Sequence, residues 1–216
     1  MRHSMMRYVL AAALGLSGVL AQAQVVYDNG GPDHVSGNNM GFAMQAEDFT
    51  LAASTTLGSV QSWSLEGAAV YRNQISFQIR ADNAGSPGGV LLAGSTASVS
   101  RTALGSVLGL TEFDNSFALP SPFALAAGHY WLVLHNGSTA EFGDPNEFLW
   151  ETTAGLPGQT GGYEAFDAND QFTPNFQEHA FNLSAVPEPA PGVALAAGLA
   201  VLFGVSRRSS NRKFEQ

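Results

Sequence analysis

Three short segments concentrate oxygen-bearing side chains between apolar stretches of the chain. The first holds Asp82 and Asn83 just before Gly85; the others hold Glu141, Asp144 and Glu147, and Asp167, Asn169 and Asp170. Carboxylate and amide oxygens are the ligands that Ca²⁺ prefers, but Ca²⁺ takes about six to eight of them, and EF-hand spacing is missing. Asp82 and Asn83 are therefore the candidate calcium ligands, with a plain turn as the alternative.

Aromatic residues form the second set with recognisable chemistry. Trp63, Trp150 and Tyr163 lie near predicted strand ends and loops, where a flat ring can stack on a sugar while its edge stays hydrated. Packing in the core is the alternative for each ring. We take these three residues as candidate glycan-binding residues.

The evidence for catalysis is weak. Glycoside hydrolysis needs two carboxylates at a set separation, which a sequence does not reveal. His129 and His135 would share the face of one strand, yet a metal site needs a third ligand, and Ser62 and Ser64 lack a Gly-x-Ser-x-Gly context. We expect a protein that is not an enzyme, has no catalytic residues and needs no cofactor other than the candidate Ca²⁺.

Composition narrows the chemistry further. The chain has no cysteine, which excludes disulfides, thiolate metal sites and a cysteine nucleophile. Residues 24–185 hold three basic residues, Arg72, Arg80 and Arg101, against sixteen acidic ones. Such a surface repels nucleic acid and suits cations or neutral sugars.

The middle of the chain alternates between short apolar segments and turn residues. Ile75, Phe77 and Ile79 alternate with polar neighbours, a period of two that predicts a strand with one buried face. Further strands are expected at 25–27, 45–51, 59–65, 90–93, 95–101, 111–118, 129–135, 147–152 and 180–185. Many short strands without an amphipathic helix predict an all-β domain at 24–185, a β-sandwich with the jelly roll as one version.

Two segments carry more specific expectations. In residues 130–134 (Tyr-Trp-Leu-Val-Leu) both faces are apolar, which predicts a central strand covered on each side, or one buried face beside an aromatic surface. Residues 120–128 contain Pro120 and Pro122. They read as an edge piece and a turn, because proline is excluded from interior ladders.

The N-terminal segment resembles a secretory signal. Arg2 and Arg7 precede an apolar run from Tyr8 to Leu20, and Ala21-Gln22-Ala23 has the small-x-small pattern of a cleavage site. We expect residues 1–23 to be a signal peptide; an uncleaved anchor is the alternative.

The C-terminal segment combines three signals. Val186-Pro187-Glu188-Pro189 precedes an uncharged apolar run at 190–206, and a basic cluster follows with Arg207, Arg208, Arg212 and Lys213. As a helix the run would extend about 25 Å, marginal for a membrane span. The basic residues would stay on the cytoplasmic side, so we expect one transmembrane helix at 190–206, with a buried core helix as the alternative.

This tail at 186–216 resembles the PEP-CTERM sorting signal. The motif maps to Pro187, Glu188 and Pro189, and the membrane stop to Arg207 and Arg208. The resemblance implies export, transient anchoring in the inner membrane, cleavage by an exosortase, and delivery to the cell surface or extracellular matrix of a Gram-negative bacterium that makes exopolysaccharide. It implies exosortase and the secretion machinery as partners.

Together these expectations describe an exported surface or matrix protein. Its all-β module would be structural or would bind extracellular polysaccharide, and it would not bind nucleic acid. The alternative is a secreted hydrolase that acts on the same polysaccharide.

Overall fold

Strands and turns make up the part of the chain that the structure, a computed structural model, describes: residues 23–154, 161–167, 169 and 171–186. These residues contain thirteen strands and no helix. The strands are β1 (Val25–Asp28), β2 (Gly37–Asn39), β3 (Met44–Leu51), β4 (Thr55–Glu66), β5 (Ile75–Asp82), β6 (Pro87–Thr96), β7 (Ser100–Val107), β8 (Leu110–Leu125), β9 (Gly128–Asn136), β10 (Phe148–Glu151), β11 (Tyr163–Ala165), β12 (Thr173–Pro174) and β13 (Phe181–Ala185). The all-β class is confirmed.

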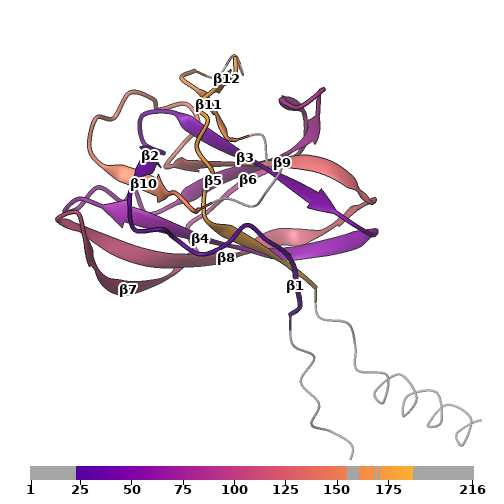
Figure 1. The fold of residues 1–216 in the computed structure, drawn as a ribbon, viewed down its shortest axis with the longest axis horizontal. Helices are drawn as coiled ribbons and strands as arrows, with labels where there is room; N and C mark the ends of the chain where they lie inside the picture. The colour runs from indigo at the N-terminus through magenta and orange to yellow at the C-terminus, as the bar shows by residue number, and fades with distance from the viewer. Residues whose placement is uncertain (1–22, 155–160, 168, 170, 187–216) are drawn as a thin grey trace, which may run out of the picture. The chain divides into compact units, whose positions relative to one another are not determined.

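The strands form two antiparallel sheets, as expected for a β-sandwich (Figure 1). Sheet A has seven strands and is built around β4, which pairs with β8 along one edge and with β13 and β10 along the other. Sheet B has six strands in the order β12-β11-β3-β9-β5-β6. Residues 24–186 form one compact unit.

The hydrophobic core collects the alternating apolar residues of both sheets. Val60 faces Phe117 across β4 and β8 in sheet A, and Ile79 faces Leu132 across β5 and β9 in sheet B. All four side chains are buried in one cluster. Because side chains alternate along a strand, the neighbours of these residues point away from the core.

Strand β9 is apolar on both faces, as the sequence predicts. Leu132 and Leu134 belong to the main core, whereas Trp131 and Val133 belong to a second buried cluster on the other face of sheet B. Residues that include Phe142, Tyr163 and Phe172 pack against this second cluster. The central, doubly covered version of the prediction is confirmed.

One strand prediction is wrong, and the edge prediction for residues 120–128 holds. Residues 95–101 do not form one strand, because β6 ends at Thr96 in sheet B and β7 starts at Ser100 in sheet A. Residues 120–125 are the last part of β8, where the strand pairs with β4 but no longer with β7, whose pairing stops at Ser116, so the predicted edge position of the prolines is confirmed. The register with β4 shifts between Leu57 and Ser59 and jumps from Ala118 to Phe123, so the prolines lie where the ladder is interrupted.

The predicted targeting segments lie outside the described residues, apart from Ala23 and Val186 at their inner ends. This applies to the signal peptide at 1–23, the motif Pro187-Glu188-Pro189, the helix at 190–206 and the stop at Arg207 and Arg208. Within the described residues, no helix is long and apolar enough to span a membrane.

Candidate functional site

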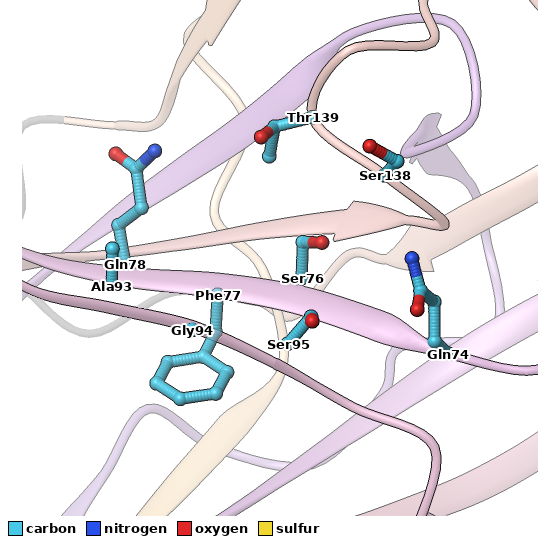
Figure 2. A pocket seen from close by; sticks show the side chains of 9 residues that line it. All are labelled: Gln74, Ser76, Phe77, Gln78, Ala93, Gly94, Ser95, Ser138 and Thr139. Atoms are coloured by element: carbon cyan, nitrogen blue, oxygen red, sulfur yellow. The ribbon is translucent and has the colours of Figure 1, made fainter.

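A polar pocket of about 310 Å³ lies on the face of sheet B that points away from the core (Figure 2). Ser76 and Gln78 reach it because they alternate with the core residues Phe77 and Ile79 along β5. The lining comes from β5, β6 and the segments beside them: Gln74, Ser76, Phe77, Gln78, Ala93, Gly94, Ser95, Ser138 and Thr139. None of these side chains carries a charge.

Hydroxyl and amide groups give this pocket donors and acceptors without charge. In Figure 2, Ser138 and Thr139 lie across the pocket from Ser76. The Ser76 hydroxyl donates to the Gly137 carbonyl oxygen at 2.6 Å, which fixes the loop after β9 to the pocket wall. The amide oxygen of Gln78 is shielded from solvent and has no hydrogen-bond partner. The pocket is suited to a neutral, hydroxyl-rich ligand.

His135 borders this region and is a neutral imidazole. It lies opposite Ser76 in the β5–β9 pairing and packs against Phe142 with ring centroids 5.1 Å apart. Both ring nitrogens are buried without a hydrogen-bond partner, and burial lowers the pKa of His135. His129 and His135 do share the face of one strand, as predicted, but six residues of strand separate them by about 20 Å, and among the described residues neither belongs to a cluster of three metal-binding side chains.

The three predicted glycan-binding aromatics do not form one platform. The prediction that Trp150 binds glycan is wrong, because this residue is fully buried. It stacks on His179 and donates its indole N–H to the Ala180 carbonyl oxygen at 2.8 Å. Trp63 is half-buried and lies opposite Asp114 on the outward face of sheet A. Tyr163 is half-buried in sheet B and packs edge-on against Trp131 at 5.1 Å.

Asp82, a predicted calcium ligand, is occupied by protein donors. Its carboxylate accepts the Trp131 indole N–H at 3.0 Å and the Gly85 backbone N–H at 3.1 Å, and it lies 3.1 Å from His129 Nδ1. Partial burial raises its pKa, but these contacts more than offset that effect and leave it below the usual value. Asn83 is exposed, so the arrangement favours the turn, and calcium at this position stays a prediction.

Carboxylates in the other two acidic segments also have protein partners. Arg72 forms ion pairs with Glu141 and Asp144, both at 2.8 Å, which tie the loop after β9 to the segment before β5. Asp167 accepts the Asn169 backbone N–H at 2.9 Å, whereas Asp170 lies outside the described residues.

Two clusters that sequence reasoning missed bring three metal-binding side chains together. In one, ligand atoms of Glu47, Asp48 and Glu178 lie within 4.8 Å of one another. Burial and the Glu47 carboxylate raise the pKa of Glu178 to about 8, and burial raises the pKa of Glu47 well above its usual value. The carboxyl groups of Glu47 and Glu178 favour the neutral, protonated form, so this cluster attracts a cation less strongly than its composition suggests.

The second cluster joins His34, Glu112 and Glu151, again within 4.8 Å. His34 lies in the loop between β1 and β2, Glu112 on β8 and Glu151 on β10. Burial and the Glu112 carboxylate raise the pKa of Glu151 to about 7, against the opposing effect of His34. No local spacing in the sequence marks this set.

Comparison with known proteins finds no matching family model, no matching curated protein and no matching solved structure.

Proposed function

We propose that this chain is an exported surface or extracellular-matrix protein whose β-sandwich, a jelly roll in its finer description, binds neutral polysaccharide without cleaving it. Residues 1–23 would direct export. The tail at 186–216 would then act as a PEP-CTERM signal, with Pro187, Glu188 and Pro189 recognised by an exosortase and with Arg207 and Arg208 holding the helix at 190–206 in the inner membrane.

The uncharged pocket carries the glycan-binding part of this proposal. In a domain with sixteen acidic residues, a pocket lined by hydroxyls and amides and by no carboxylate is a distinct local environment. Sugars present hydroxyl groups that both donate and accept hydrogen bonds, so they match such a lining. An anionic ligand would find no basic partner among the lining residues.

The binding test uses the purified chain and polysaccharide from the producing cells, together with a glycan array. We expect retention by a neutral glycan, with affinity at least tenfold weaker in the double variant Gln74→Ala, Thr139→Ala. The matched control is Thr102→Ala, Ser106→Ala on β7, which also removes two polar side chains but lies in sheet A. Equal binding by the pocket variant and the control would count against the pocket.

The sorting proposal has a separate test, namely mapping the C-terminus of the mature protein in its host. We expect a mature chain that ends near Pro187-Glu188-Pro189. A mature chain that retains Arg207 onward would contradict processing of the tail, while leaving the glycan-binding result unaffected.

A secreted hydrolase is the second candidate, and the adjacent carboxylates of Glu112 and Glu151 are the observation in its favour. Glycosidases place their two carboxyl groups about 5 to 9.5 Å apart, whereas ligand atoms of this pair lie within 4.8 Å. Such close carboxylates are better arranged to hold a cation. Release of reducing ends that is lost in Glu151→Gln would instead favour the hydrolase.

A further inference from the structure

The loop between β1 and β2 is fixed to the end of β10, which positions His34. Backbone hydrogen bonds join Asp33 N to Thr152 O and Thr152 N to Ser36 O, both at 2.9 Å. The Thr152 hydroxyl also donates to Asp33 Oδ1 at 2.8 Å. These contacts flank His34, so its imidazole is held beside Glu151, the residue before Thr152.

The two carboxylates of the cluster share one side of sheet A. Glu112 lies opposite Leu65, which in turn lies opposite Leu149, two residues before Glu151. Glu151 alternates with the core residue Trp150, so it points away from the core. Antiparallel pairing of β4 with β8 and with β10 therefore brings both glutamates together.

Both carboxylates are buried without the partners that a buried acid requires. The Glu151 side chain is 0% exposed, and neither of its oxygens has a side-chain hydrogen-bond partner; the backbone N–H of His34 faces it and lowers its pKa. The Glu112 side chain is 6% exposed, and its Oε1 also lacks one. The facing group for both is His34 Nδ1, 3.4 Å from Glu151 Oε1 and 3.5 Å from Glu112 Oε1. An unsatisfied buried carboxylate destabilises the fold unless a cation compensates it.

We propose that His34, Glu112 and Glu151 form a divalent metal site of the zinc type. The three ligand atoms are His34 Nδ1, Glu112 Oε1 and an oxygen of Glu151. One ion would compensate both carboxylates and connect the β1–β2 loop to β8 and β10.

Two of the three distances between the ligand atoms match a small tetrahedral ion. Zinc bonds to nitrogen and oxygen are about 2.0–2.2 Å long, so neighbouring ligands of a tetrahedral site lie about 3.3–3.6 Å apart. The distances from His34 Nδ1 to the two glutamate oxygens fall in this range. An imidazole ligand and a small ligand number also disfavour Ca²⁺, which takes six to eight oxygens.

The site keeps one coordination position for a non-protein ligand. Three protein ligands leave the fourth position of a tetrahedral ion for water or a ligand hydroxyl. The His34 side chain is 55% exposed, so this side of the site is open to solvent. Such an ion lies on sheet A and is therefore separate from the proposed glycan pocket on sheet B.

The test measures Zn²⁺ binding to the purified full chain after chelator treatment, by calorimetry and by metal analysis after dialysis. We expect one Zn²⁺ per chain and a rise in the unfolding temperature on adding the metal. Glu151→Gln and His34→Ala should each weaken binding at least tenfold and abolish that rise. Co²⁺ in place of Zn²⁺ should show the strong visible absorption of a four-coordinate ion.

The matched control is His129→Ala, which removes a histidine that also lies between two carboxylates, Asp48 Oδ2 at 2.7 Å and Asp82 Oδ1 at 3.1 Å. This variant should bind Zn²⁺ like the unmodified chain. The proposal is overturned if the unmodified chain binds no Zn²⁺, if folded Glu151→Gln binds it with unchanged affinity, or if Ca²⁺ binds more tightly. Should His34→Ala fail to fold, the isosteric Glu151→Gln still decides.

Discussion

His179 directs its backbone N–H and its imidazole Nδ1 to the same carboxyl oxygen of Glu47, at 2.9 and 2.8 Å. Its other ring nitrogen, Nε2, lies 3.0 Å from the amide oxygen of Asn38. The side chains of Glu47 and His179 are fully buried. Because Glu47 lies on β3 in sheet B and Asn38 on β2 in sheet A, this buried network links the two sheets.

The chemistry of these contacts defines where the protons lie. An amide oxygen only accepts, so Nε2 carries the hydrogen in a neutral imidazole and Nδ1 accepts from the Glu47 carboxyl group. This agrees with the pKa directions, because burial raises the pKa of Glu47 well above its usual value and lowers that of His179 to about 3. In this arrangement the Glu47 carboxyl group donates to Nδ1 and accepts the His179 backbone N–H.

This arrangement makes Glu47→Gln destabilising even though the shape is kept. An amide nitrogen can donate to Nδ1 but cannot accept the His179 backbone N–H, so one buried group loses its partner. We expect the free energy of unfolding to fall by about 1–3 kcal/mol in urea titrations at pH 7. Glu141→Gln, whose side chain is 63% exposed, is the control and should change it by about 0.5 kcal/mol or less.

The raised pKa of Glu151 predicts that the effect of Glu151→Gln on the free energy of unfolding depends on pH in metal-free buffer. Its folded-state pKa of about 7 exceeds the ordinary value of 4.5. Its contribution to the stability of the fold is therefore fully present below pH 4.5 and is lost as the pH rises toward 7. Glu151→Gln should therefore gain stability relative to the unmodified chain between pH 4.5 and 7, by at most about 1.4 kcal/mol per pH unit. Urea unfolding at pH 5 and pH 7 with a chelator present measures this, and a constant difference would contradict it.

Gly94 provides a test of packing beneath the pocket. A Cβ added there would lie 2.8 Å from the Phe77 ring, whereas one added at Gly89 on the same strand meets nothing within 4 Å. Gly94→Ala should lower the free energy of unfolding by about 1–3 kcal/mol through overpacking. Gly89→Ala should leave the free energy of unfolding almost unchanged. Thermal unfolding of both variants measures the difference.

The burial of Trp150 predicts a large stability effect. Trp150→Ala removes a ring at 0% exposure and leaves the Ala180 carbonyl without its donor, so the free energy of unfolding should fall by about 3–5 kcal/mol. Trp63→Ala, at a half-buried position, should cost clearly less. Similar losses for both variants would contradict the core position of Trp150.

Local pattern determined the fold class, because the alternation of apolar and polar residues is a property of neighbours in the chain. Ile75, Phe77 and Ile79 reach the core as their period of two requires, and β9 is covered on both faces as its continuous apolar run predicts. The same signal was present at Trp150, which alternates with Leu149 and Glu151 and shares a face with Phe148. Phe148 and Trp150 are both buried in the core.

Tertiary structure alone decided which polar groups meet. His34, Glu112 and Glu151 lie on a loop and two strands that are far apart in the sequence, and only the pairing of β4 with both β8 and β10 brings them within 4.8 Å. The pocket on sheet B likewise depends on β9 and its following loop returning beside β5. The composition of the chain favours cations and sugars as ligands. Register and burial depend on contacts between residues far apart in the sequence, so only the fold determines where each ligand could bind.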